Sequence, residues 1–397
     1  MKREDSIVMK SVELFSGCGG LAMGLAQSGF HHLAMVEWNA EACATLQHNK
    51  RRKVRHVKAW PFQQADVRSI DWNAIAECVD LVAGGPPCQP FSIGGKGGGN
   101  ADERDMWPEA VRAVRELQPK AFLFENVRGL LRPAFTNYLN WIQACLARPE
   151  ARRRQNESHD EHVARLSRMR GVPTYRVEVF AVNAADYGAP QKRHRVIIAG
   201  GRSDLDIHFD FPEPTHTYER LLWDQWVSGE YWERHNMSAP KSGPTDKRAI
   251  RIVERLKSSL LAPKGRAWVT VRDAIHGLGE PGNSSTVLNH TFQAGARIYP
   301  GHTGSPLDEP AKALKAGDHG VPGGENMMVK DDGSVRYFTI REAARLQGLP
   351  DEFEFPRSWT ESMRQLGNAV PVQLANAMGK TLSTALRASS CSISKAA

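Results

Sequence analysis

The chain has 397 residues, of which 41% are hydrophobic and 24% are charged, and its formal net charge is +8. This composition excludes a wholly disordered chain, and the length suffices for a full hydrophobic core and a second domain. No stretch approaches the roughly 18 apolar residues of a membrane span, and the first residues lack the apolar centre of a signal peptide. The excess of Lys and Arg suits a polyanionic partner such as nucleic acid.

The cysteines show no disulfide or metal pattern. There is no C-x-x-C pair and no His/Cys cluster at zinc spacing. We therefore expect free thiols, no bound metal, and a soluble protein of the reducing cytoplasm. The six cysteines are Cys18, Cys43, Cys78, Cys88, Cys145 and Cys391.

Short apolar runs alternate with helix-like segments over roughly the first 200 residues, which predicts an α/β sheet with helices on its faces. The expected strands are Ser11–Phe15, His32–Glu37, Asp80–Ala83, Ala121–Glu125, Arg176–Asn183 and Arg195–Gly200. The expected helices are Leu21–Ser28, Ala40–His48, Pro108–Leu117 and Ala134–Ala147.

The later part of the chain breaks this alternation. Residues 148–173 are polar and rich in arginine, so they either follow a nucleic-acid backbone or form a solvated insertion. Residues 201–335 are rich in Pro, Gly, His and Trp, which predicts a smaller, loop-rich domain. Helix signals return at Thr339–Gln347 and Pro371–Leu386. The first domain is therefore expected to comprise residues 1–200 and 336–397.

A glycine turn between the first strand and the first helix suits a nucleoside cofactor. Gly17 and Gly19 allow a ligand to approach the backbone and expose N–H groups at a helix start. Glu37 follows Gly17 by 20 residues, where a carboxylate can bond ribose hydroxyls. Trp38 could stack on an adenine, and Asp66 could accept from its amino group. The pattern also fits G-x-G-x-x-A, so NAD remains an alternative at this point.

Cys88 lies in a Gly-Gly-Pro-Pro-Cys-Gln-Pro-Phe-Ser stretch at residues 84–92. This stretch follows the apolar run Val79–Ala83 and precedes a glycine loop at Gly94–Gly99. A thiol on a stiff Pro-Pro turn beside a flexible loop suits attack on a substrate that the loop covers. The alternative is a small buried filler, which is the usual role of a free cysteine.

Two further segments carry charge at positions suited to chemistry. Glu125 ends an apolar strand, and the carboxyl ends of strands are where ligands bind in open α/β sheets. In Gln191–Arg195, strand alternation predicts that Arg193 and Arg195 point to one side and present two cationic forks to a carbonyl or phosphate. Either segment alone is more often an ordinary surface feature.

Taken together and in order, these motifs resemble those of the DNA (cytosine-5) methyltransferase family, of the bacterial restriction-modification type. The resemblance covers about residues 11–200 and 336–382. The motifs are Phe15-x-Gly17-x-Gly19, Pro87-Cys88-Gln89-x-Phe91-Ser92, Glu125-Asn126-Val127, Gln191-x-Arg193-x-Arg195, Arg341-Glu342-Ala343-Ala344-Arg345-Leu346-Gln347-Gly348 and Gly367-Asn368-Ala369-Val370.

The resemblance implies a Rossmann-like methyltransferase domain with a mostly parallel sheet and a target-recognition domain at residues 201–335. It also implies S-adenosylmethionine as cofactor, with S-adenosylhomocysteine as product, which displaces the NAD alternative; no metal is expected. The residues expected to bind the cofactor are Phe15, Gly17, Gly19, Glu37, Trp38, Asp66, Val67, Pro87, Asn368 and Ala369.

The resemblance further implies a role for each catalytic side chain. The Cys88 thiolate adds to C6 of cytosine, so that C5 becomes nucleophilic enough to accept the methyl group. Glu125 holds N3 and the exocyclic amine and protonates the ring. Arg195 binds O2, and Arg193 supports the cysteine or a phosphate. The base must leave the stack to be reached, and the glycine loop closes over it.

The implied partner is double-stranded DNA, with a cognate restriction endonuclease acting separately and the methyltransferase itself a monomer. A tRNA cytosine methyltransferase and a catalytically silent DNA-binding module remain alternatives. Methylation of duplex DNA and not of tRNA would exclude the tRNA methyltransferase. Specific binding of duplex DNA without methylation would favour the silent binding module. The expected DNA contacts are Ser92, Lys96, Arg104, Gln293, Arg297, His302, Lys315 and His319.

Overall fold

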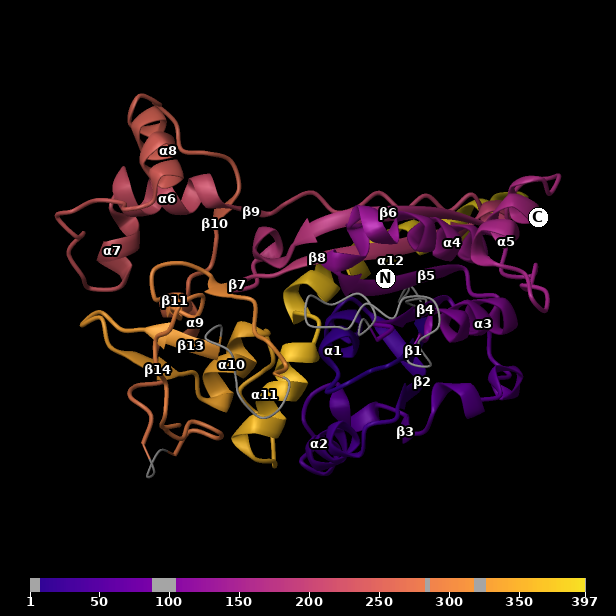
Figure 1. Cartoon of the computed structure of the whole chain (residues 1–397), viewed down its shortest axis with the longest axis horizontal. Helices are drawn as coiled ribbons and strands as arrows, with labels where there is room; N and C mark the ends of the chain where they lie inside the picture. The colour runs from indigo at the N-terminus through magenta and orange to yellow at the C-terminus, as the bar shows by residue number, and fades with distance from the viewer. Residues whose placement is uncertain (1–7, 88–104, 283–285, 318–325, 397) are drawn as a thin grey trace, which may run out of the picture.

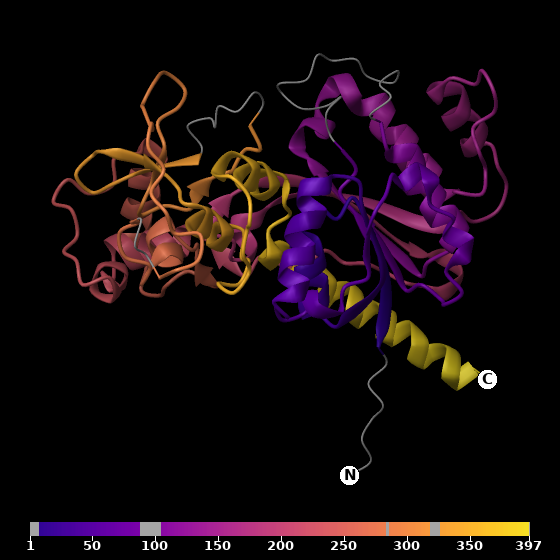
Figure 2. The same cartoon turned by 90° about the horizontal axis from the view of Figure 1, so that it is seen from below.

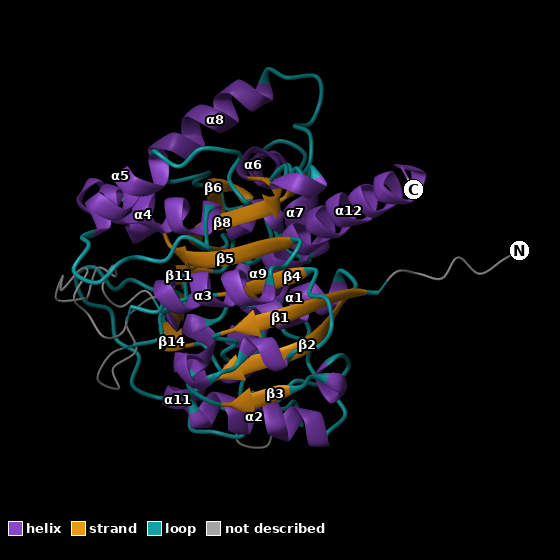
Figure 3. Cartoon of the chain, turned by 90° about the vertical axis from the view of Figure 1, so that its right-hand side faces the viewer, coloured by secondary structure: helices purple, strands orange, loops and turns teal. Residues whose placement is uncertain are grey.

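The computed structural model describes residues 8–87, 105–282, 286–317 and 326–396. It is built on a seven-stranded sheet in the order β3-β2-β1-β4-β5-β8-β6, with helices on both faces (Figures 1 and 3). The strands from β3 to β5 pair in parallel, and β8 pairs antiparallel with both β5 and β6. The predicted α/β fold with a mostly parallel, Rossmann-like sheet is therefore confirmed.

The elements have the following bounds. The strands of the large sheet are β1 (Met9–Leu14), β2 (Phe30–Glu37), β3 (Phe62–Gln64), β4 (Leu81–Gly84), β5 (Ala121–Val127), β6 (Tyr175–Asn183) and β8 (His194–Arg202). The helices are α1 (Gly20–Gln27), α2 (Ala40–Arg51), α3 (Trp107–Leu117), α4 (Thr136–Ala147), α5 (His159–Ser167), α6 (Tyr218–Trp226), α7 (Glu230–Arg234), α8 (Lys247–Lys257), α9 (Val271–Ile275), α10 (Ile340–Leu346), α11 (Trp359–Asn368) and α12 (Val372–Ala396). The short strands are β7 (Gln191–Lys192), β9 (His216–Thr217), β10 (Arg266–Ala267), β11 (Ser305–Pro306), β12 (Ala311–Lys312), β13 (Met327–Val329) and β14 (Val335–Tyr337).

The large sheet is buried on both faces, and β5 shows how its sequence achieves this. Side chains alternate across a strand. Phe122 and Phe124 therefore pack in one core with residues of α3 and α4, and Ala121 and Leu123 pack in another with residues of α1 and α12. Because both faces are covered, the strand reads as a continuous apolar run, which is why it was predictable.

Helices α1 and α12 pack so closely that Gly24 has no room for a side chain. A Cβ at Gly24 would lie 2.3 Å from the Ala375 Cβ and 2.6 Å from the Asn376 backbone nitrogen. Figure 2 shows α12 running beside α1 under the part of the molecule that carries the sheet. The last long helix thus packs directly against the first helix of the chain.

A Gly24→Ala substitution is expected to lower the free energy of unfolding, because the added methyl group overpacks backbone atoms that cannot move aside, at a cost of about 1–3 kcal/mol. After the gain of about 1 kcal/mol in helix propensity, the net loss is up to about 2 kcal/mol. The measurement is urea unfolding followed by circular dichroism. The control is Gly282→Ala, where a Cβ meets no atom within 4 Å. Equal stabilities of the two variants would contradict the packing argument.

Six of the predicted strands match observed strands to within two residues at each end. The missed elements include strand β3 and helix α5. Strand β3 is three partly exposed residues at the sheet edge. Helix α5 lies within the arginine-rich segment 148–173 and begins with a capping box between Ser158 and Glu161.

The described residues between 216 and 335 lie largely on one side of the molecule (Figure 2). The hydrophobic cores, however, do not end at residues 201 and 336. Leu222 and Val253 belong to a small separate cluster. Val271 and Leu314 instead share a core with Phe338, which precedes α10, and with residues of α10 and α11. The region also contains helices α6 to α9, so it is less loop-dominated than predicted. The exact domain boundaries remain a prediction.

Candidate active site

The sheet topology brings three chain segments to one edge. Leu14 of β1 pairs with Gly84 of β4, and Gly84 pairs with Phe124 of β5. The residues that follow these parallel strands therefore lie side by side at the carboxyl edge, where open α/β sheets bind ligands. A Cβ at Gly85 would lie 3.6 Å from Oε2 of Glu125, which places the Gly-Gly-Pro-Pro segment beside that carboxylate.

The glycine turn after β1 is held by Glu37. The Gly17 N–H donates to Oε2 of Glu37 at 2.8 Å, and the Asn39 N–H donates to Oε1 at 2.8 Å. Phe15 and Gly17 both have positive φ, 57° and 53°, a conformation that turns the chain sharply. The predicted juxtaposition of Gly17 and Glu37 is confirmed, and the buried carboxylate still has lone pairs available for hydroxyl donors.

The turn leaves room for a ligand at one glycine and not at the other. A Cβ at Gly17 would meet no atom of the described residues within 4 Å, whereas one at Gly19 would lie 2.5 Å from the Trp60 ring. The Trp38 side chain is 73% exposed, so its face is accessible for stacking. These features fit the adenosine part of S-adenosylmethionine, with open space at the turn, an acid for the ribose and an aromatic face for the base.

Asp66 carries a partner that the sequence did not suggest. Both carboxylate oxygens accept from the Arg68 side chain, and Oδ1 also accepts from the Arg68 N–H. Its hydrogen bonds with the Arg68 side chain lower the pKa of Asp66, so the carboxylate remains an acceptor. Val67, next to it, is buried and begins a short 3₁₀ turn, and Pro87 is half-buried.

The C-terminal motif returns to the glycine turn. A Cβ at Gly20 would lie 2.4 Å from the Val370 carbonyl oxygen, and the Cys18 thiol donates to the Gln365 carbonyl at 3.7 Å. Asn368, at the end of α11, is exposed, and Ala369 is buried. The structure thus brings together the two ends of the predicted cofactor site.

One further residue links these ends and was not predicted. Arg364 of α11 donates to Oδ1 of Asn39 at 3.1 Å, directly beside the backbone N–H that binds Glu37. A hydrogen bond and ion pair with Glu361 raise the pKa of Arg364, so it stays charged. The contact joins residues 325 positions apart, and no local pattern indicates it.

Glu125 and Arg195 form an ion pair at the same edge. Arg195 Nε lies 2.6 Å from Glu125 Oε1, and the two side chains are only 13% and 11% exposed. The antiparallel register of β5 and β8 places Arg195 opposite Val127, two residues from Glu125. A carboxylate acceptor and a guanidinium donor thus lie next to each other at the carboxyl edge of the sheet.

The expectation that Arg193 and Arg195 face one ligand is wrong. Arg193 lies between β7 and β8, so strand alternation does not carry through it. Its side chain is buried and donates to the Leu314 carbonyl at 3.0 Å and the Gly367 carbonyl at 2.6 Å. Arg193 therefore ties the sheet to the residue that precedes Asn368.

Asn126 fixes the segment that leads to Cys88. It is buried and donates from Nδ2 to the Pro86 carbonyl at 3.0 Å, while its Oδ1 accepts from the Val127 N–H. Pro87 is the last described residue before Cys88. Cys88, Ser92, Lys96, Arg104 and the Gly94–Gly99 loop lie outside the described residues, as does His319.

The remaining predicted DNA contacts lie on the surface of the 286–317 range. Arg297 and Lys315 are exposed, and Gln293 and His302 are partly exposed. His302 pairs with Tyr299 across a Pro-Gly turn, through hydrogen bonds in both directions. Phe292, Ile298 and Tyr299 expose apolar surface on the same stretch, a feature that was not predicted.

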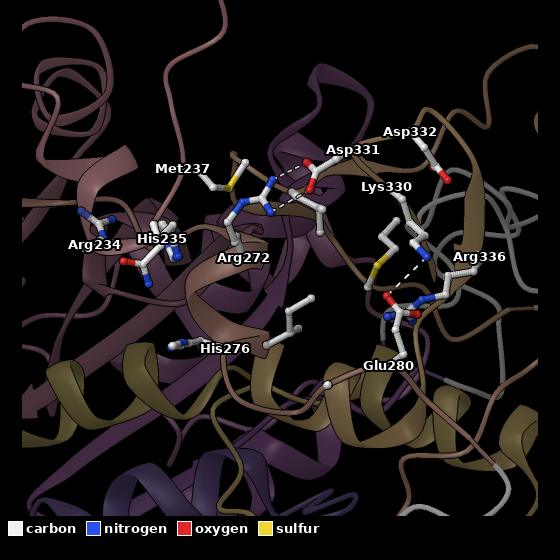
Figure 4. A pocket seen from close by; sticks show the side chains of 15 residues that line it. Arg234, His235, Met237, Arg272, His276, Glu280, Lys330, Asp331, Asp332 and Arg336 are labelled. Atoms are coloured by element: carbon white, nitrogen blue, oxygen red, sulfur yellow. Dashed lines mark hydrogen bonds and ion pairs between the residues drawn. The ribbon is translucent and has the colours of Figure 1, made fainter.

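A cavity of about 490 Å³ lies away from this edge, between α7, α9 and the β13–β14 hairpin (Figure 4). Its cations are already neutralised: Arg272 lies 2.6 Å from Asp308, Lys330 lies 3.3 Å from Glu280, and Arg336 and Arg234 also have carboxylate partners. This pairing indicates a structural role. Within the described ranges, no group of His, Cys, Asp and Glu is arranged to hold a metal, and no helix is long and apolar enough to cross a membrane.

Solved structures share this fold along nearly the whole chain. An E. coli protein described as a DNA modification methyltransferase encoded within a prophage aligns with a TM-score of 0.59 and 22% identity, covering 96% of this chain and 99% of that one. Spodoptera frugiperda DNMT2 aligns with a TM-score of 0.54 and 15% identity, covering 94% and 99%. At these identities the likeness concerns the fold.

The sequence comparisons are more specific. The family model of the C-5 cytosine-specific DNA methylases matches residues 9–148 and 153–384. Type II methyltransferase M.NgoMIV of Neisseria gonorrhoeae is 31% identical, with 95% of this chain and 98% of the relative covered. Type II methyltransferase M.PspPI of Psychrobacter sp. (strain TA137) is 32% identical, with 98% and 82% covered. With an acid–arginine pair and a nucleoside-type turn at one sheet edge, the chain belongs to the C-5 cytosine-specific DNA methylase family and is a DNA (cytosine-5) methyltransferase.

Proposed function

We propose that this enzyme transfers the methyl group of S-adenosylmethionine to C5 of one cytosine in a short, specific double-stranded DNA sequence, using a flipped-out base and covalent addition of Cys88. The single observation that carries the proposal is the meeting, at one sheet edge, of the Glu125–Arg195 pair, the Glu37-bound glycine turn and the Pro-Pro segment that leads to Cys88. A cytosine ring and a methyl donor can be held side by side only where both sites share an edge.

The chemistry assigns a distinct task to each side chain. The Cys88 thiolate forms a bond to C6, and the ring electrons move to C5, which then takes the methyl group. Glu125 binds N3 and the exocyclic amine and supplies the proton that the ring needs as it becomes an enamine. Arg195 donates to O2. Loss of the C5 proton then expels the thiolate and restores the aromatic ring, so Cys88 is regenerated.

Other residues act by holding these groups in place. Asn126 fixes the backbone that precedes Cys88, and Arg193 fixes the turn that carries Asn368. We assign both a positioning role. Glu37, Trp38 and the Gly17 turn would hold the adenosine part of S-adenosylmethionine, which supplies an activated methyl group on its sulfonium when bound. The Gly94–Gly99 loop would cover the flipped base, with Lys96 and Arg104 on phosphates.

Residues 201–335 would carry the choice of DNA sequence, because their surface includes the exposed Arg297 and Lys315. The type II methyltransferases among the relatives suggest a role in a restriction-modification system, with a separate cognate endonuclease. The enzyme would act as a monomer in the cytoplasm.

The test is bisulfite sequencing of DNA from a host that expresses the protein. We expect one short sequence to carry methylated cytosine at every occurrence. Tritiated cofactor should label duplex DNA and leave tRNA unlabelled. Label in tRNA alone would favour an RNA methyltransferase, and specific binding of duplex DNA without label would favour a silent binding module.

A Glu37→Gln variant is expected to bind S-adenosylhomocysteine about 10- to 100-fold more weakly, since a charged acceptor for ribose is lost and an amide N–H faces a backbone N–H. Titration calorimetry measures this directly. The control is Glu41→Gln, because Glu41 lies nearby on α2 and pairs with Arg357. A Glu37→Gln affinity within twofold of that of Glu41→Gln would exclude the ribose role.

A further inference from the structure

A second hollow, of about 400 Å³, lies between α3, α4 and the arginine-rich segment that follows α4. Its walls come from three elements that are separate in sequence but packed together, since α3 contacts α4 and α4 contacts α5. The match to the family model is interrupted at residues 149–152, within this segment. The arginines that line the hollow are Arg112, Arg115, Arg148, Arg152 and Arg153.

Two of these arginines are used by the fold. Arg112 lies 2.7 Å from Glu109 and 3.0 Å from Glu116, and it also donates to two backbone carbonyls. Arg148 donates to the carbonyls of residues 169 and 171. The charge of Arg112 is therefore compensated, and Arg148 is fixed in position.

The other three arginines are not compensated in this way. Arg115 has only a long contact of 3.7 Å to Glu116, and its buried Nε has no hydrogen-bond partner in the described part of the chain. Arg152 and Arg153 are exposed, and neither side chain makes a hydrogen bond or ion pair with any described residue. The cavity of Figure 4 differs, because its cations have carboxylate partners.

These weakly compensated charges act on one another and on their neighbours. Burial, and then the charge of Arg152, lower the pKa of Arg115. Burial, and then the charge of Arg153, lower the pKa of His159, so that this imidazole is neutral at pH 7. His159 stacks on Trp141 with ring centroids 4.1 Å apart and forms a flat wall of the hollow. Bound anions would relieve this mutual repulsion of the arginines.

The hollow begins beside the active-site edge of the sheet. Asp105 and Pro108 line it, and they stand at the start of α3, which follows the Cys88 segment that leaves the end of β4. From there the hollow extends away from the site toward the C-terminal end of α4. DNA that enters the site and is longer than the recognised sequence can therefore pass over it.

We propose that Arg115, Arg152 and Arg153 bind backbone phosphates of duplex DNA outside the recognised sequence. The proposal rests on the proposed function in that the substrate is a duplex. The cluster extends the footprint on DNA and strengthens binding without reading bases, because phosphate contacts carry no sequence information. The enzyme should therefore bind long duplexes more tightly than short ones of the same sequence.

The test compares an Arg152→Gln/Arg153→Gln variant with a matched Arg168→Gln/Arg170→Gln variant, which removes the same charge from exposed positions of the same segment. Fluorescence anisotropy gives the affinity of each for 14- and 40-base-pair duplexes carrying the methylated sequence. We expect wild type and the matched variant to bind the long duplex about 10-fold more tightly than the short one. The Arg152→Gln/Arg153→Gln variant should lose this preference. The slope of its log binding constant against log salt concentration should be smaller in magnitude by about 2 than that of wild type.

The apo form of the Arg152/Arg153 variant should melt at or above the wild-type temperature, because repulsion is removed. A retained length preference would overturn the proposal. So would a loss of preference together with a lower melting temperature, since the arginines would then be structural. Pyrophosphate that stabilises wild type but not the variant, without any change in length preference, would assign the site to a small phosphate and also overturn it. Methyl transfer is assayed separately from DNA binding. Failure of the proposed function would therefore appear as lost methyl transfer, and failure of this proposal as a retained length preference in binding.

Discussion

A Cys88→Ala variant is expected to lose methyl transfer by a factor of at least about 10⁴, because the proposed activation of C5 requires addition of the Cys88 thiolate to C6. Binding of S-adenosylhomocysteine should stay within about twofold of wild type, since the cofactor residues are unchanged. The measurement is transfer of tritiated methyl groups to duplex DNA under single-turnover conditions. A Cys88→Ala variant with near-native turnover would contradict the proposed role of Cys88 as the nucleophile.

The four cysteines whose side chains are described are poor alternatives to Cys88. Burial raises the pKa of Cys18 and Cys145 to about 12 and that of Cys43 to about 11, so these thiols are not nucleophiles at neutral pH. Cys78 is exposed, but it precedes β4 and so lies at the opposite edge of the sheet from the active site. Cys78→Ala is therefore the matched control, and it should retain full activity.

A covalent trap gives a second measurement for Cys88. A duplex with fluorine at C5 of the target cytosine leaves no C5 proton to remove after methyl transfer, so the bond between the thiol and C6 cannot be eliminated. Wild type should form a stable adduct on a denaturing gel, and Cys88→Ala should form none. An adduct with the alanine variant would place the nucleophile elsewhere.

The sequence predicted elements whose signal is local and missed those whose signal depends on tertiary contacts. Strand β5 was predictable because burial of both faces makes it uniformly apolar. Strand β3 has no such run, because it is short and lies at the sheet edge. Helix α5 was hidden in a charged segment, although its Ser158-x-x-Glu161 capping box is a start signal that could have been found.

The same distinction holds for the candidate site. The 20-residue spacing of Gly17 and Glu37 follows from the length of one helix and one strand, so it could be predicted. Asn126 and Arg364 contact residues 40 and 325 positions away, and only the folded chain shows their positioning roles. Arg193 was misassigned because a break between β7 and β8 interrupts strand alternation.

The motif at residues 341–348 contributes to the fold rather than to the chemistry. Arg341 is fully buried and donates to the carbonyls of Leu288, Pro350 and Phe353. Glu342 pairs with Arg336 at 2.7 Å. Such buried, paired charges fix the arrangement of segments that are distant in sequence, because each unpaired alternative would leave a buried charge. A motif shared with enzymes therefore need not mark residues that touch substrate.

A Glu125→Gln variant is expected to lower the methyl-transfer rate by about 10²–10⁴, because the amide cannot supply the proton that the ring requires. The substitution also exchanges the carboxylate that would accept from the cytosine amine for a neutral amide, and it leaves Arg195 without its carboxylate partner. Cofactor affinity should be unchanged. The readout is the single-turnover rate at saturating DNA, compared with that of Arg195→Met.

A change in the base separates recognition of the amine from a structural role. If Glu125 binds the exocyclic amine, part of the penalty of Glu125→Gln should disappear on a duplex whose target base lacks that amine. If the Glu125–Arg195 pair serves only to hold β5 against β8, the penalty will be the same on both bases and will follow the loss of unfolding free energy. Glu125 lies beside the Pro-Pro segment and pairs with the Arg195 guanidinium. We therefore expect a smaller penalty of Glu125→Gln on the base that lacks the amine, because Glu125 would both pair with Arg195 and bind the cytosine ring.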